Sequence, residues 1–231
     1  MNRNTFILIS TLLALLIVTI HASDALSRDT SFSGDGKVTT RFSGGSDIGS
    51  GIAVQSDDKI VVVGTSDHGS GVSEFAVARF NANGSRDTSF SGDGRVTTSF
   101  SAGDDVGSGI AVQSDDKIVV VGTSDKGSGI SEFAVARFNV DGSLDTSFSG
   151  DGRVTLSFTA GDDVGSGIAV QSDDKIVVVG TADDGSGDSQ FAVARFNVDG
   201  SLDLSFNGDG RVTTSFSADD DVGSGIAIQS E

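Results

Sequence analysis

The chain has 231 residues, with 15 Lys and Arg against 33 Asp and Glu, which gives a formal net charge of −18. Nucleic acids and anionic membrane surfaces bind basic faces, so this charge argues against both as partners. The absence of Cys excludes a disulfide scaffold, thiol catalysis and Cys-based zinc sites, and the absence of Pro excludes collagen-like and polyproline architectures.

The first 27 residues have the layout of a secretory signal peptide. Arg3 supplies positive charge, residues 6–20 form an uncharged apolar run, and small and polar residues follow. Cleavage after Ala22 or after Ala25 fits this pattern. The alternative is an uncleaved membrane anchor, but an apolar run of fifteen residues is shorter than the ~20 that span a bilayer. We therefore expect a secreted or cell-surface protein, with no membrane contact after cleavage.

The rest of the chain is one unit repeated at a period of 58 residues. The string DTSFSGDG begins at Asp29, Asp87 and Asp145, and the variant DLSFNGDG begins at Asp203. Such a fixed period indicates a repeat architecture. The repeats are 28–85, 86–143, 144–201 and a partial 202–231.

Each repeat contains four segments with strand patterns, which in the first repeat are 37–42, 51–55, 59–65 and 75–80. The third segment is a continuous β-branched run, so we expect its central residues to be buried on both sides of a sheet. These residues are Val62, Val120 and Val178. The recurring phenylalanines, which are Phe32, Phe42, Phe75 and Phe80 in the first repeat, are expected to fill the core.

Four short antiparallel strands per repeat predict an all-β, propeller-like fold with four-stranded blades. The segments amount to about three and a half blades, an incomplete ring. A β-solenoid is the alternative, although its coils are usually shorter. Open blade edges invite pairing, so we also expect self-association through them.

The repeat also resembles a known family. Residues 117–122, 133–143 and 144–148 carry a pattern similar to the delta-60 repeat, a bacterial β-propeller domain of unknown function. The resemblance covers 28–231 and implies secreted bacterial proteins with no assigned activity. The family usually has Pro-Asp-Gly-Lys in the central hairpin, whereas this chain has Ser-Asp-Asp-Lys at 56–59. Asp58 must therefore adopt a left-handed conformation or the turn must change type.

Calcium is the one cofactor that the sequence suggests. Asn139, Asp141 and Asp145 have an N-x-D-G-x-x-D spacing that resembles calcium loops of EF-hands and integrin-type propellers. Asp105 and Asp163 are further candidates, since hard cations prefer oxygen-rich turns. The simpler interpretation is that Asp favours turns by bonding to its own backbone.

An arginine stands where the first calcium ligand of such a loop belongs. Arg137 holds this position, and Arg79 and Arg195 hold it in the neighbouring repeats. Its guanidinium repels a cation, and it offers donors to a carboxylate in one plane. We therefore expect Arg137 to pair with Asp141 or Asp145 in a turn without metal.

The sequence offers little material for catalysis, and no catalytic or cofactor-binding residue is predicted. His68 is the only histidine after the signal segment, and no G-x-S-x-G or H-E-x-x-H motif is present. We expect a secreted, acidic β-propeller that acts as a non-catalytic binding or structural module in cell-surface adhesion, with a protein or glycan ligand. The alternatives are a calcium-stabilised propeller and a propeller-based polysaccharide lyase or hydrolase.

Overall fold

The computed structural model describes residues 28–67, 69, 71–127, 129–183, 185, 188–217 and 219–229. The signal segment expected at 1–27 lies outside these residues, as does His68. The described part of the chain contains twelve β-strands and no helix. Accordingly, it contains no helix of the length and hydropathy that crossing a membrane would need.

The chain divides into two compact units, residues 1–38 and 39–231. The described residues of the first unit form a turn, in which the N–H of Phe32 donates to the Asp29 carbonyl and the N–H of Gly36 donates to the Phe32 carbonyl. The second unit contains all twelve strands.

The strands of the second unit form three sheets of four strands, and in each sheet consecutive strands pair antiparallel in chain order. Blade 1 comprises β1 (Asp47–Val54), β2 (Ile60–Asp67), β3 (Ser73–Phe80) and β4 (Arg95–Thr98). Blade 2 comprises β5 (Asp105–Val112), β6 (Ile118–Asp125), β7 (Ser131–Phe138) and β8 (Arg153–Leu156). Blade 3 comprises β9 (Asp163–Val170), β10 (Ile176–Asp183), β11 (Ser189–Phe196) and β12 (Arg211–Thr214).

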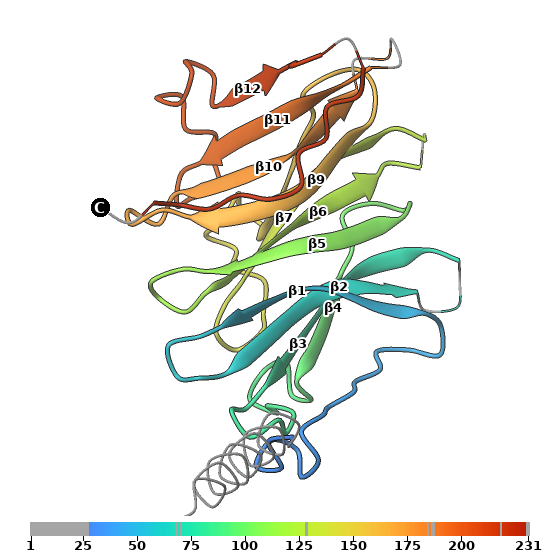
Figure 1. Cartoon of the computed structure of the whole chain (residues 1–231), viewed down its shortest axis with the longest axis vertical. Helices are drawn as coiled ribbons and strands as arrows, with labels where there is room; N and C mark the ends of the chain where they lie inside the picture. The colour runs from blue at the N-terminus through green and yellow to red at the C-terminus, as the bar shows by residue number, and fades with distance from the viewer. Residues whose placement is uncertain are drawn as a thin grey trace, which may run out of the picture. The chain divides into compact units, whose positions relative to one another are not determined.

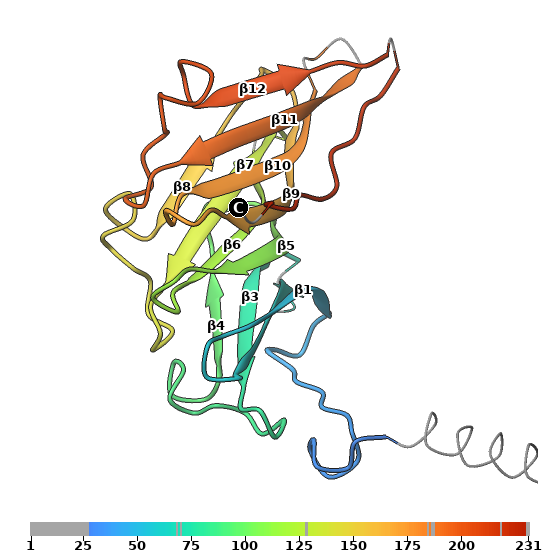
Figure 2. The ribbon, with the colours of Figure 1, turned by 60° about the vertical axis from the view of Figure 1, so that its left-hand side comes forward.

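The blades follow one another in chain order and pack through their first strands (Figures 1 and 2). β5 lies against β1, β2 and β3 of blade 1, and β9 lies against β5, β6 and β7 of blade 2. Antiparallel meanders that meet at their innermost strands are consecutive blades of a propeller. This topology confirms the all-β propeller prediction, and it differs from the parallel coils of a β-solenoid.

The apolar core lies between the blades. Between blades 1 and 2, Val61, Val63 and Phe75 pack against Ile118 and Val120. An equivalent cluster joins blades 2 and 3. Burial of apolar area on both faces of a central strand explains the β-branched runs that the sequence shows.

The predicted burial of the central valines is confirmed in two blades of three. Val120 and Val178 are fully buried. Val62 is only half-buried, because among the described residues no blade precedes blade 1 and covers its face. Similarly, Phe75 and Phe80 are buried, whereas Phe32 and Phe42 are half-buried.

A glycine in the second strand of each blade lets an aromatic ring of the preceding blade approach. A Cβ atom on Gly122 would lie 2.7 Å from the Cζ atom of Phe75, and one on Gly180 would lie 2.6 Å from that of Phe133. Real Cβ atoms do not approach so closely, so the glycine is needed for blade packing.

The central hairpin keeps its turn, with aspartate in the left-handed region. Asp58, Asp116 and Asp174 have φ angles of 62°, 61° and 59°. The first of the two conformations expected for Asp58 is therefore the one adopted. A non-glycine residue in this region costs about 1 kcal/mol, and Asp is among the residues that tolerate it best.

The expected strand at 37–42 does not form. Its counterparts in later repeats, β4, β8 and β12, each pair with the third strand of the blade that comes before them in the chain. Among the described residues, no such strand precedes residue 37. The blades therefore begin at Asp47, Asp105 and Asp163, a different phase from the repeats counted from residue 28.

The last repeat contributes an extended segment instead of a half-blade. Residues 221–228 are not assigned to a strand, although their sequence matches those of β1, β5 and β9. The N–H of Gly223 donates to Thr181 Oγ1 at 3.3 Å, as Gly165 does to Thr123 in the preceding blade at 3.2 Å. This segment lies along blade 3 in the place of an inner strand (Figure 2).

Candidate functional site

The proposed calcium loop is a tight turn that follows β7. The N–H of Asn139 donates to the Ser143 carbonyl at 2.8 Å, and Gly142 takes a φ of 87°. Asp141 Oδ1 accepts from the N–H of Ser143 at 3.0 Å and from its hydroxyl at 2.6 Å. These hydrogen bonds lower the pKa of the exposed Asp141 carboxyl. The aspartate thus stabilises its own turn, as the simpler interpretation of the sequence holds.

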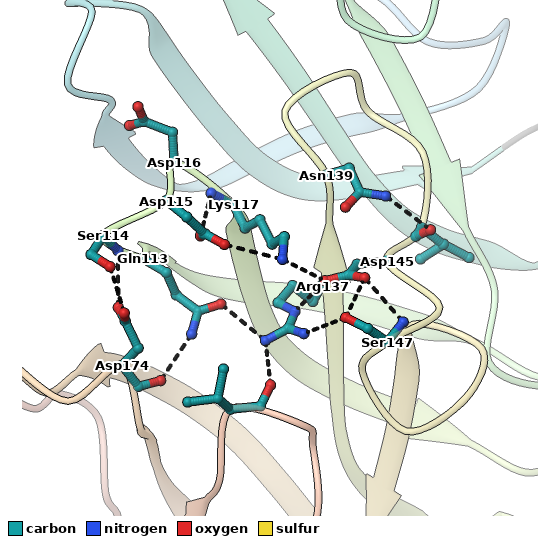
Figure 3. Close-up of polar contacts among 12 residues, drawn as sticks. Gln113, Ser114, Asp115, Asp116, Lys117, Arg137, Asn139, Asp145, Ser147 and Asp174 are labelled. Atoms are coloured by element: carbon teal, nitrogen blue, oxygen red, sulfur yellow. Dashed lines mark hydrogen bonds and ion pairs between the residues drawn. The ribbon is translucent and has the colours of Figure 1, made fainter.

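Arg137 is buried at the centre of the site and pairs with Asp145 (Figure 3). Its Nε donates to Asp145 Oδ2 at 2.8 Å, and its Nη2 donates to Ser147 Oγ at 3.1 Å. Of the two partners that the sequence predicts for Arg137, the structure selects Asp145 and leaves Asp141 outside the pair.

The remaining donors of Arg137 bridge to other parts of the molecule. Nη1 donates to Gln113 Oε1 at 3.2 Å and to the carbonyl oxygen of Val198 in blade 3 at 2.5 Å. The guanidinium also stacks 4.8 Å from the ring centre of Phe148. One guanidinium therefore joins the central hairpin, the turn after β7 and the next blade, which lysine cannot do.

A second cation approaches the same carboxylate. Lys117 Nζ lies 3.3 Å from Asp145 Oδ2 and 3.0 Å from Asp115 Oδ2. Burial raises the pKa of Asp145, but the Ser147 hydrogen bonds, the Arg137 charge and the Lys117 ammonium outweigh burial and lower it to about 2. Asp145 is therefore ionised at neutral pH, and protein donors occupy its oxygens.

The same network recurs in the other two blades. Arg79 Nε donates to Asp87 Oδ2, and Arg195 Nε donates to Asp203 Oδ2, both at 2.8 Å. Arg79 also donates to Gln55 and to the Val140 carbonyl, as Arg137 does to their equivalents. For Arg195 no contact equivalent to these last two is present in the described part of the chain.

Asp105 and Asp163 lie at the other end of their blades. In blade 2, Asp105 pairs in register with Ser124, and Ser124 with Glu132 near the start of β7. Asn139 follows the last residue of that strand. Asp105 therefore does not join Asn139, Asp141 and Asp145 in one site. Within the ranges that the structure describes, no group of three His, Cys, Asp or Glu side chains is arranged to hold a metal ion.

Asp105 and Asp163 are both fully buried and hold a bend that precedes their strands. Oδ2 of Asp105 accepts from the N–H of Phe100 at 2.8 Å, and Oδ2 of Asp163 accepts from that of Phe158 at 2.7 Å. Burial raises the pKa of Asp163, and the hydrogen bonds from Phe158 and Thr159 offset this only in part. The role that the contacts support for both residues is structural.

Sequence reasoning missed a set of residues that connect adjacent blades through their central hairpins. Gln55 Nε2 donates to the Asp116 carbonyl at 2.7 Å, and the N–H and hydroxyl of Ser56 donate to the Asp116 carboxylate at 2.9 and 2.5 Å. Gln113 and Ser114 make the same contacts with Asp174 (Figure 3). The repetition of Gln-Ser-Asp-Asp in three hairpins was the available signal.

A family model matches the chain at three places, residues 55–90, 113–148 and 171–206. Its description is a domain of unknown function (DUF5122) that forms a β-propeller. The chain contains three repeats of this β-propeller family. Each DUF5122 match begins at the Gln that binds the next hairpin and ends at the repeated phenylalanine 35 residues later, which is Phe90 in the first match. The match confirms the resemblance to delta-60 repeats, which are the same kind of family. No curated protein matches the chain.

Proposed function

We propose that this DUF5122 chain is an exported, non-catalytic binding or structural module that serves in cell-surface adhesion. The observation that carries the proposal is the use of the repeated ionisable residues. Arg137, Asp145 and Lys117, together with their equivalents in blades 1 and 3, bind one another or hold adjacent parts of the fold. Side chains committed in this way are not available to a substrate.

The surface left for a ligand is acidic and polar. Asp141 and Asp199 are exposed at the same turn of blades 2 and 3, and Asp115 and Asp173 are exposed at the central hairpins. Repeated turns on one scaffold suit a ligand that itself repeats, such as a glycan or a fibrous protein, because weak contacts then add through multivalency. Export is supported by the signal-like pattern of residues 1–27.

The test combines location with binding. Fractionation of the producing cells should place the chain in the medium or on the cell surface. The purified chain should then bind immobilised envelope glycans or surface proteins, and Asp141→Asn combined with Asp199→Asn should weaken this binding without lowering the melting temperature. A chain found only inside the cell would refute the proposal, as would binding that both substitutions leave unchanged.

Two alternatives are separated by simple measurements. A calcium-stabilised propeller would show a rise in melting temperature with calcium that is lost in Asp141→Ala. A polysaccharide lyase or hydrolase would show activity that is lost in Asp105→Ala or Asp163→Ala. The complete burial of Asp105 and Asp163 argues against the second alternative, since a substrate must reach a catalytic carboxylate.

A further inference from the structure

Blade 3 exposes a face that blades 1 and 2 bury against the blade that follows. Phe75 and Phe133 are fully buried, but Phe191 at the same position is half-buried. Val193 differs from its buried equivalents Val77 and Val135 in the same way. Among the described residues, no blade covers this face of blade 3.

A cavity of about 200 Å³ marks the missing contact. It is lined by Val179, Phe191 and Val193 of blade 3 and by Gly223 and Gly225 of the extended segment 221–228. At the two internal junctions, the second strand of the next blade passes this point and sets a glycine against the phenylalanine ring. The cavity thus has the place and the lining of a blade junction.

The polar groups around this face also lack the partners that their equivalents have. Gln171 Oε1 is buried without a hydrogen bond, whereas the same atoms of Gln55 and Gln113 accept from Arg79 and Arg137. The Arg195 side chain is 21% exposed, against 2% for Arg137. Ser172 donates no hydrogen bond within the described residues, whereas Ser56 and Ser114 each donate two to an aspartate of the next blade.

Blade 1 carries the complement of these groups. Asp58 has the same left-handed conformation as Asp116 and Asp174, but its carboxylate accepts no hydrogen bond among the described residues. Around it, Ile52 and Val54 are 67% and 60% exposed, whereas Ile110 and Val112 at the same positions of blade 2 are half-buried. An exposed apolar patch beside an unpaired carboxylate indicates a contact surface.

We propose that blade 3 of one copy of this chain docks against blade 1 of a second copy, with Ser172 of the first donating to Asp58 of the second. Gln171 donates to the Asp58 carbonyl, and Arg195 Nη1 donates to the carbonyl of Ala82, the residue equivalent to Val140 and Val198. The two internal junctions are the template, because the same residue types make these contacts twice within the chain. This inference does not depend on the ligand proposed above.

The extended segment must yield its place in this assembly. Residues 221–228 have the sequence DVGSGIAI, and β1 has DIGSGIAV, so both fit the inner-strand position on blade 3. The segment pairs with no strand, and its Gly223 N–H bond to Thr181 is one that Gly49 of the incoming β1 can replace. We therefore infer that β1 of the second copy displaces residues 222–228 without breaking a sheet.

A contact between two different faces has a distinct consequence for assembly. It joins head to tail, so one copy can dock at both ends and oligomers can grow beyond two copies. With a net charge of −18 on each copy, association should strengthen as salt screens the repulsion. Both properties can be measured on the purified chain.

The experiment is sedimentation velocity on the purified chain and on two variants, Asp58→Gly and Ser172→Ala. Each variant should weaken self-association about tenfold or more, the loss expected for a hydrogen bond to a charged group. Asp58→Gly should leave the fold intact, because glycine suits a φ of 62° better than aspartate does. Asp57→Asn, at the exposed neighbouring residue, is the matched control and should leave association unchanged.

Mixing the two variants gives the decisive result. The Asp58→Gly copy keeps an intact blade 3 face, and the Ser172→Ala copy keeps an intact blade 1 face. The mixture should therefore form heterodimers with the affinity of the unmodified junction, and growth should stop at two copies. A chain that stays monomeric at every concentration would overturn the proposal. So would association that neither variant weakens, or a mixture that associates no better than each variant alone.

Discussion

Asp116 in the central hairpin of blade 2 holds Ser56 of blade 1 through both the backbone N–H and the hydroxyl of the serine. It does so from a left-handed backbone conformation that glycine adopts more easily. The residue that departs from the usual hairpin of delta-60 repeats is thus the residue that joins adjacent blades. Local strain at Asp116 is offset by contacts between blades.

Asp116→Gly should therefore destabilise the protein although it relieves the backbone. The gain of about 1 kcal/mol from glycine is smaller than the loss of two hydrogen bonds to a charged acceptor, each contributing about 1.5–3 kcal/mol. Urea unfolding should show a net loss of about 1–3 kcal/mol. Asp58→Gly is the matched control and should be neutral or stabilising at concentrations where the chain is monomeric. Equal effects of the two substitutions would contradict this account.

Val120→Asp should be severely destabilising, because Val120 is fully buried between blades 1 and 2. A lone buried carboxylate costs several kcal/mol unless it is neutralised. Val62→Asp should cost clearly less, since Val62 occupies the same position in blade 1 but is half-buried. Circular dichroism during thermal unfolding compares the two variants. A cooperatively folded, stable Val120→Asp variant would show that β6 is not a core strand.

Arg137→Asp should lose about 3–5 kcal/mol of stability, since it leaves the Asp145 carboxylate buried without its arginine partner. The new carboxylate beside Asp145 should also create a cation site, so millimolar calcium should restore part of the loss. Arg195→Asp is the matched control and should lose less, because Arg195 is more exposed and lacks two of the contacts that Arg137 makes. Calorimetry showing tight calcium binding to the unmodified loop, abolished by Asp141→Ala, would instead favour the calcium-stabilised alternative.

The Asp145 carboxylate should make stability fall in acid. Its pKa is lowered to about 2 in the folded chain, from an ordinary value of 3.8, so the folded state favours the ionised form. This contribution is fully present above pH 3.8 and is lost as the pH falls through about 2. Unfolding free energies measured from pH 5 downwards should fall less steeply for Asp145→Asn than for the unmodified chain. Identical slopes would show that Asp145 titrates normally in the folded state.

Ala182→Ser should lower the pKa of Asp163 and stabilise the protein at neutral pH by about 1 kcal/mol. Blade 1 supplies the precedent, in which Ser66 Oγ donates to Asp47 Oδ1 at 2.7 Å. Burial raises the pKa of Asp47 too, but Ser66 and the backbone N–H groups of Phe42 and Ser43 outweigh it. The pKa of Asp163 can be followed by NMR titration of its carboxyl carbon. An unchanged pKa would mean that the new hydroxyl does not reach the carboxylate.

The fold could be predicted largely because the periodicity and the strand patterns agree. The β-branched runs lie where the central strands are, and their burial follows from blades on both sides. The phase of the blades could not be read in the same way, because the most recognisable string, DTSFSGDG, lies in the loop between the third and fourth strands. A boundary drawn at that string cuts through every blade.

The candidate site was predicted in part. The chemistry of a guanidinium indicated that Arg137 would pair with a carboxylate, and the choice of Asp145 over Asp141 needed the backbone of the turn. The contact of Gln113 with Asp174 could not be predicted, because it joins residues 61 apart whose proximity depends on how blades stack. Asp105 and Asp163 looked like surface turn residues, and only the structure shows that they are buried.

The contiguous meander of each blade has a consequence for how such genes change length. Because β1 to β4 follow one another within a single period, a recombination event that adds or removes 58 residues always adds or removes one complete blade, wherever in the repeat the exchange occurs. The joined halves come from equivalent positions, so every hairpin, turn and blade junction is rebuilt from matching parts. An exchange of any other length would leave a strand without its neighbour. Selection on folding alone therefore preserves the period of the repeat while leaving the number of copies free to vary.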